Sequence, residues 1–177
     1  MCKNNKNDAS FLVDDIIVYG YKKDILFITD AERKKNYVFD LISLSKKEYG
    51  IISKKLPFVS NLYVIENIFF VLIYKYNISL SKCYEKFKNI IKWLKINDLL
   101  WVYKHELTDL ELFKCMFLRA LTIEPSIIFI DGISEEEFSL TMKILDFLDK
   151  DIFLWILAEK NDNFLLNNNS FKKIYLS

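Results

Sequence analysis

The chain has 177 residues, 52% of them hydrophobic, which is enough for one domain with a sizeable core. Lys plus Arg number 25 and Asp plus Glu 24, so the charge balance gives no reason to expect nucleic-acid binding or adhesion to anionic lipid. Cys2, Cys83, Cys115 and the single histidine, His105, provide neither a disulfide framework nor metal-ligand spacing. The longest apolar run, Ile65–Ile73, is broken by Glu66 and Asn67 and is too short to span a bilayer, so we expect no direct membrane insertion.

The first part of the chain alternates between strand and helix patterns. Asp24–Thr29 is a continuous apolar run bounded by charge, as in a strand buried on both faces. We predict a helix from about Lys35 to Leu44 and a short strand at Gly50–Ser53. Only three glycines occur in the whole chain and no two are close together, which excludes an intact phosphate-binding loop or dinucleotide fingerprint.

The middle of the chain is nearly all helix. Asn61–Tyr76 is predicted as a largely apolar helix, and Ser79–Ile96 as an amphipathic helix with lysines opposite its apolar stripe. A third helix, Leu110–Thr122, ends before Pro125, because proline cannot continue a helix. These patterns predict a helical insertion over about residues 61–121.

Strand and helix patterns alternate again towards the C-terminus. Ser126–Asp131 is a second buried-strand pattern, followed by a helix at about Glu136–Leu148. Ile152–Ala158 is predicted as a third long strand and Phe171–Leu176 as a last one. Strands that alternate with helices predict an α/β domain with a mostly parallel sheet and helices on both faces.

The stretch from Leu107 to Asp131 carries a resemblance to a known family. Its Leu-Thr-Asp-Leu-Glu loop, helix ending in Leu-Arg-Ala-Leu and Glu-Pro pair resemble, without a gap, the signature region of ABC-type ATP-binding cassettes. There a Leu-Ser-Gly-Gly-Gln loop and an Ala-Arg-Ala-Leu helix precede the Walker B strand. Upstream, Asn61–Asn67 is similar to the stretch that opens the family's helical subdomain, and Val13–Thr29 resembles the strand pair before its P-loop.

The resemblance implies a set of site positions. Lys35 falls on the position of the phosphate-binding lysine. Asn36 falls on the next position, which binds Mg²⁺ in the family, and Tyr37 on the one after it. The Walker B aspartate, which would hold Mg²⁺ through water, is Asp131, and the switch position is Glu159. The signature-loop positions are Leu107, Thr108, Asp109, Leu110 and Glu111, and Tyr19 or Tyr21 would stack on adenine.

Departures from the family pattern fall on the positions that face nucleotide. Thr29, Glu32 and Lys34 replace the P-loop glycines, Asp109 and Leu110 replace the signature glycines, and Gly132 stands in place of the catalytic glutamate. Phosphoryl transfer is catalysed mainly by positioning and charge stabilisation. We therefore expect no catalytic residues, and ATP and Mg²⁺ to bind weakly or not at all.

Structural roles compete with functional ones at several of these positions. Lys35 lies in a basic run and is interpreted first as a solvated lysine. Asp131 with Gly132 is also a good turn, so a capping role stands beside Mg²⁺ binding. His105 is expected to pack at a loop and Cys115 in the core. In the family a coupling helix of a membrane subunit docks in the groove beside Asn61–Tyr76, so an exposed Phe58, Leu62 or Tyr63 would indicate docking.

These patterns together predict one degenerate ABC nucleotide-binding domain over residues 1–177. Its fold would be P-loop NTPase-like: a mostly parallel sheet flanked by helices, with an inserted helical subdomain and a truncated N-terminal β-subdomain. The function hypothesis is a pseudo-ATPase subunit that pairs with a complete ABC ATPase or with itself and docks on a membrane permease. It would be cytoplasmic and peripheral at the inner face of the membrane. The alternatives are a weak ATP-binding or ATP-hydrolysing subunit completed by a partner, and a soluble regulatory or structural protein.

Overall fold

The computed structural model describes residues 22–44 and 49–176. The predicted strand pair over Val13–Thr29 therefore lies mostly outside the described residues, as do Tyr19 and Tyr21. The chain divides into two compact units. One comprises the described residues up to Ile51 and from Ser126 onwards, and the other comprises Ile52–Pro125.

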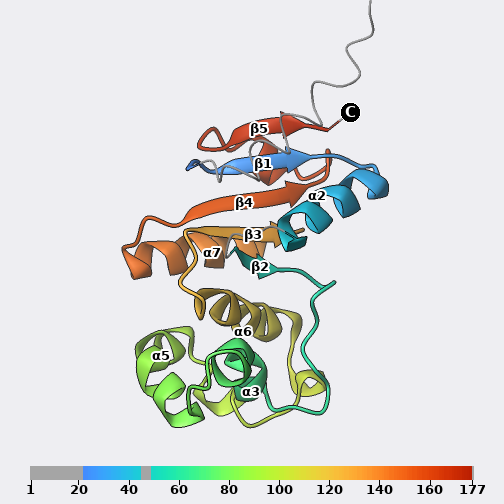
Figure 1. The fold of residues 1–177 in the computed structure, drawn as a ribbon. Helices are drawn as coiled ribbons and strands as arrows, with labels where there is room; N and C mark the ends of the chain where they lie inside the picture. The colour runs from blue at the N-terminus through green and yellow to red at the C-terminus, as the bar shows by residue number, and fades with distance from the viewer. Residues whose placement is uncertain (1–21, 45–48, 177) are drawn as a thin grey trace, which may run out of the picture. The chain divides into compact units, whose positions relative to one another are not determined.

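The first unit is built on a five-stranded sheet (Figure 1). The strands are β1 (Ile25–Ile28), β2 (Gly50–Ile52), β3 (Ile127–Asp131), β4 (Phe153–Ala158) and β5 (Lys172–Tyr175). Their order across the sheet is β2-β3-β4-β1-β5. Strand β4 pairs in parallel with both β3 and β1, and β1 pairs in parallel with β5. The predicted α/β class and mostly parallel sheet are confirmed.

Three helices belong to this unit: α2 (Glu32–Leu44), α7 (Glu135–Leu148) and α8 (Asn163–Leu166). Val38 and Ile42 of α2 are buried in one cluster with Phe27, Phe129 and Trp155 of the sheet. Every residue of β1 is buried, so this strand is covered on both faces, as its unbroken apolar sequence predicts.

Helix α2 begins at Glu32 and not at Lys35, where the sequence placed its start. The residues Glu32, Arg33 and Lys34 are good helix formers, and an acidic residue in the first turn suits the helix dipole. The earlier start shortens the loop after β1 to Thr29, Asp30 and Ala31.

The second unit is helical, with α3 (Val64–Ile68), α4 (Phe70–Tyr74), α5 (Leu80–Leu94) and α6 (Asp109–Leu121). The prediction of one helix over Asn61–Tyr76 is wrong at its start and at Phe69, where the helix is interrupted. Tyr63 forms an antiparallel bridge with Tyr103, and the backbone N–H of Val64 donates to the carbonyl of Val102 at 3.0 Å. This pairing keeps Tyr63 extended, and the residues just before it form a turn, so the helix cannot begin at Asn61.

Helix α5 follows its predicted amphipathic pattern. Cys83, Ile90, Ile91 and Leu94 are buried along one face, whereas Phe87 is only half-buried. The helix ends at Lys95, whose φ of 57° is left-handed. Among the residues that the structure describes, no helix combines the length and apolar character needed to cross a membrane.

Candidate functional site

The carboxyl ends of three neighbouring parallel strands gather the residues assigned to a phosphate site. Helix α2, which carries Lys35, follows β1; Asp131 is the last residue of β3; and Glu159 directly follows β4. Strand β4 lies between β3 and β1, so these ends meet at one edge of the sheet. Open parallel sheets bind their ligands at this edge.

Lys35 is held by carboxylates. Its ammonium group bonds the carboxylate of Glu159, and the Glu32 carboxylate lies 3.9 Å away. The hydrogen bond to Glu159 is the main cause that raises the pKa of Lys35, with smaller contributions from the charges of Glu159, Glu32 and Asp131. The side chain is only 16% exposed, so Lys35 is not the solvated lysine that its basic run suggested.

A second ion pair joins the loop after β4 to the loop after β1. The ammonium group of Lys160 lies 3.1 Å from the carboxylate of Asp30, and the Lys160 backbone N–H donates to that carboxylate at 2.9 Å. These bonds from Lys160, the backbone one first, hold the pKa of Asp30 below its ordinary value. We call Asp30, Lys35, Glu159 and Lys160 the clasp: the segment after β1 contributes Asp30 from its loop and Lys35 from the first turn of α2, and the loop after β4 contributes Glu159 and Lys160.

The backbone of the loop after β1 is engaged within the loop and the first turn of α2. The backbone N–H groups of Lys34 and Lys35 both donate to the carbonyl of Ala31, at 2.8 and 3.1 Å. The N–H of Ala31 donates to the hydroxyl oxygen of the buried Thr29 at 3.2 Å. In phosphate-binding loops, backbone N–H groups at this place point at phosphate oxygens. Here three of them have partners within the chain.

The turn after β3 contains Gly132, which the sequence resemblance aligns with a catalytic glutamate. Gly132 has a φ of 77°, and its N–H donates to the carbonyl of Leu157 at 3.1 Å. The nearest acidic run starts α7, where the Glu137 carboxylate accepts from the backbone N–H of Ser134 at 2.8 Å and so completes a capping box. Asp131 is half-buried, and its negative charge acts on Lys35.

The signature-loop positions form the start of α6. Thr108 is the N-cap: its hydroxyl oxygen accepts from the Glu111 N–H, and the Glu111 carboxylate accepts from the Thr108 N–H at 2.9 Å. The bonds that the Thr108 N–H and hydroxyl group donate to the Glu111 carboxylate lower the pKa of Glu111. Asp109 is exposed in the first turn, and Leu107 and Leu110 are half-buried. The chain's own carboxylates therefore occupy the positive end of this helix.

The remaining predicted ligand positions are on the surface. Asn36 and Tyr37 are exposed on α2, and Tyr37 is 38% exposed to solvent. Over residues 22–44 and 49–176, no three His, Cys, Asp or Glu side chains are arranged to hold a metal ion. His105 is exposed, and its ring is stacked on that of Tyr103 with the ring centroids 6.0 Å apart. Cys115 is buried, and burial raises the pKa of its thiol to about 12, so the thiol is unreactive.

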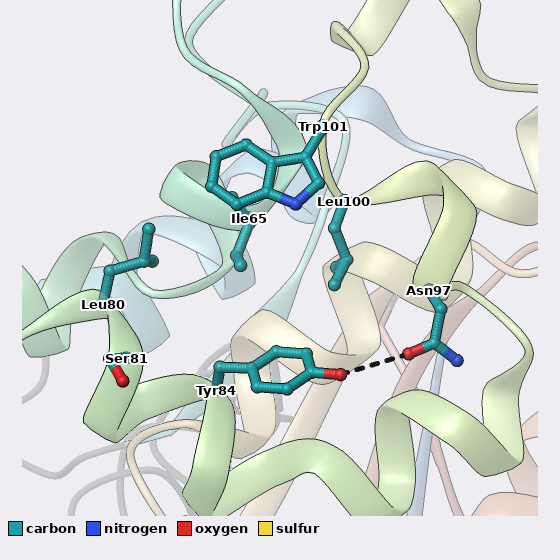
Figure 2. Close-up of a pocket in the computed structure, with 7 residues that line it drawn as sticks. All are labelled: Ile65, Leu80, Ser81, Tyr84, Asn97, Leu100 and Trp101. Atoms are coloured by element: carbon teal, nitrogen blue, oxygen red, sulfur yellow. Dashed lines mark hydrogen bonds between the residues drawn. The ribbon is translucent and has the colours of Figure 1, made fainter.

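A pocket of about 400 Å³ lies within the helical unit (Figure 2). It is lined by Ile65, Leu80, Ser81, Tyr84, Asn97, Leu100 and Trp101. The hydroxyl of Tyr84 points to the side-chain oxygen of Asn97 at 3.5 Å. Trp101 is 60% exposed and makes an edge-to-face contact with Tyr63, which is exposed as well. Of the other side chains that would indicate docking, Phe58 is buried and Leu62 is half-buried.

Sequence reasoning missed two members of the clasp and one buried polar residue. Asp30 and Lys160 stand 130 positions apart, and no local pattern links them. Asn67 is 2% exposed; its side-chain oxygen accepts from the N–H of Val59, and its amide donates to three backbone carbonyls. Asn67 lies within an apolar helical run, and this position could have indicated a buried asparagine. A buried polar side chain is expected to be hydrogen-bonded.

Comparison with known proteins places the fold. No family model matches the sequence, and no curated protein matches it significantly. A dimeric post-hydrolysis structure of the ATP-binding cassette MJ0796 bound to ADP and Pi matches with a TM-score of 0.66 and 15% identity, over 88% of this chain and 82% of that one. A second dimeric structure of MJ0796, described as a bacterial ABC transporter cassette, matches with a TM-score of 0.60 and 14% identity, over 87% and 82%. The chain has the P-loop NTPase-like α/β fold of ABC cassettes, as predicted.

Proposed function

We propose that this chain is a non-catalytic, pseudo-ATPase subunit of the ABC type that assembles with an ABC ATPase, a membrane permease or both. The observation that carries the proposal is the state of the segment formed by the loop after β1 and the first turn of α2. Its backbone N–H groups at Ala31, Lys34 and Lys35 have partners within the chain, and the Lys35 ammonium group is paired with Glu159.

The chemistry of phosphoryl transfer explains why this loop matters. The protein accelerates the reaction by positioning the phosphates and by stabilising their charge with N–H groups, a lysine and a metal ion. Here a carboxylate engages the lysine, and Gly132 has no side chain to polarise an attacking water. At the proposed signature positions, Asp109 and Glu111 in the first turn of α6 oppose an approaching phosphate.

The test is ATP hydrolysis by the purified full chain. We expect no phosphate release above background at millimolar ATP with Mg²⁺, with a complete ABC ATPase as the positive control. The chain is also assayed at high protein concentration, so that an activity that depends on dimer formation is detected. Phosphate release that follows the concentration of this chain, and that is lost in Lys35→Met, would overturn the proposal.

A second candidate is an ATP-binding subunit whose site is completed by a partner. The observation that favours it is that Lys35 and Asp131 still meet at the carboxyl edge of the sheet. Such a chain would bind a fluorescent ATP analogue in the presence of Mg²⁺ without hydrolysing it alone. If no affinity can be measured at millimolar ATP, this candidate function is refuted and the proposal of a non-catalytic subunit remains.

The proposed partners are a permease and a second cassette. Both solved structures above are dimeric cassettes, which supports pairing of this chain with itself or with a complete ABC ATPase. In the helical unit, the exposed Trp101 at the pocket and its neighbour Tyr63 suit a membrane subunit's docking segment. The chain would then act in the cytoplasm, peripheral at the inner face of the cell membrane.

Recovery of the tagged chain from membranes tests this assembly. We expect a permease or an ABC ATPase among the bound proteins. Trp101→Ser should lower permease recovery, whereas Tyr74→Ser, which changes an aromatic residue of the same unit that is 62% exposed and outside the pocket lining, should not. Recovery of neither partner would refute the assembly role.

A further inference from the structure

The clasp places negative charge where a phosphate-binding edge needs positive charge. Lys35 faces the carboxylates of Glu159 and Glu32, and the charge of Asp131 also reaches it. The second cation, Lys160, is paired with Asp30. An incoming phosphate would therefore meet four carboxylates, and each of the clasp's two cations is already paired with one of them.

We propose that Glu159 is a built-in counter-ion that takes the place of a nucleotide phosphate beside Lys35 and thereby excludes phosphate ligands from this chain. The inference rests on the proposed non-catalytic function and names the residue that enforces it.

Glu159 is held in place by its surroundings. Its own backbone N–H donates to the carboxylate of Asp162 at 2.8 Å, and the next N–H, that of Lys160, donates to Asp30 at 2.9 Å. The first bond orders the loop after β4, and the second ties this loop to the loop after β1. The backbone that carries Glu159 is therefore already positioned beside Lys35. A phosphate must compete with this carboxylate for the positive charge of Lys35.

The test is the affinity of Mg-ATP and of inorganic phosphate for the wild-type chain, Glu159→Gln, Glu32→Gln and the double variant Glu159→Gln with Lys35→Met. Glutamine keeps the size of the side chain and removes its charge. We expect Glu159→Gln to bind both probes about three- to fivefold more tightly than wild type, near the upper end of what release of one partly exposed ion pair gives. The gain should shrink at high salt and vanish in the double variant.

Glu32→Gln is the matched control, because it removes the same charge from a side chain whose carboxylate lies 3.9 Å from Lys35. It should change affinity less than about twofold. An equal gain in both variants would show a general charge effect and overturn the proposal, and so would the absence of any gain in Glu159→Gln.

The reactivity of the Lys35 amine provides a measurement that needs no ligand. Because the Glu159 bond raises the pKa of Lys35, reductive methylation followed by peptide mass spectrometry should label Lys35 slowly in wild type and several-fold faster in Glu159→Gln. Equal labelling rates would contradict the pairing, and the same comparison in Glu159→Ser covers poor folding of the glutamine variant. If wild type hydrolyses ATP, the proposed function fails; if wild type is inactive and Glu159→Gln gains nothing, only this inference fails.

Discussion

Gly132 permits a sharp test of the turn that follows β3. Its φ of 77° lies in the left-handed region, and a Cβ added there would meet no heavy atom within 4 Å. The cost of a side chain at this position is therefore a backbone cost of about 1–2 kcal/mol. Replacing glycine also lowers the conformational entropy of the unfolded chain, which stabilises the folded state by about 0.5–1 kcal/mol. We expect Gly132→Ala to lower the free energy of unfolding by about 1 kcal/mol net.

A series of substitutions separates this backbone effect from side-chain contacts. Asparagine tolerates the left-handed region, so Gly132→Asn should cost less than Gly132→Ala, and Gly132→Glu should cost about as much as alanine because its Cβ meets open space. Urea denaturation followed by circular dichroism measures the differences. A neutral alanine variant, or an asparagine variant as costly as alanine, would refute the left-handed conformation.

The same series has a functional arm. Gly132→Glu restores the residue type that the ABC family uses to activate water, but it leaves Lys35 paired with Glu159 and the N–H groups of the loop after β1 engaged. We therefore expect no ATP hydrolysis from Gly132→Glu. Turnover in this variant alone would show that the loop after β1 can hold phosphate, contrary to our reading of its geometry.

Three further predictions concern the helical unit. Arg119 donates to two backbone carbonyls at 2.6 and 3.4 Å, and burial lowers its pKa to about 10; Arg119→Met should cost about 2 kcal/mol in chemical denaturation, and Arg119→Lys less. Because bonds from Thr108 lower the pKa of Glu111 below 4.5, the stability lost in Glu111→Gln should be full above pH 4.5 and shrink as pH falls through the folded-state pKa; a pH-independent difference in thermal midpoint would contradict this. Asn67→Ala should cost about 2–3 kcal/mol, whereas the exposed control Asn61→Ala should stay within about 0.5 kcal/mol.

The strands could be predicted from the sequence because burial on both faces leaves an unbroken apolar run. Ile127–Asp131 and Phe153–Ala158 lie within the predicted ranges for this reason. The start of α2 was misplaced, since the family alignment put a phosphate-binding loop where Glu32, Arg33 and Lys34 are free to be helical. Without glycines, nothing keeps these residues out of the helix.

Contacts between distant loops could not be predicted in the same way. The partners Lys35 and Glu159 are 124 positions apart, and their meeting depends on β4 lying beside β1 in the sheet. Strand order is set by how the helices pack across the sheet, and no local pattern encodes it. The sequence supplied the residue types of the site, and the topology supplied the pairing.

The features of this edge depend on one another, so no single reversion should recover nucleotide binding of the ordinary strength. Because α2 starts at Glu32, the N–H groups of Lys34 and Lys35 are satisfied by Ala31 and are not presented to a phosphate. The half-buried ammonium group of Lys35 needs an anionic partner, and the Glu159 carboxylate is that partner. Glycines restored at Thr29, Glu32 and Lys34 would free the backbone and leave the lysine occupied, whereas Glu159→Gln frees the lysine and leaves the backbone engaged. Tight binding requires both changes together, and their effects on affinity should therefore be more than additive.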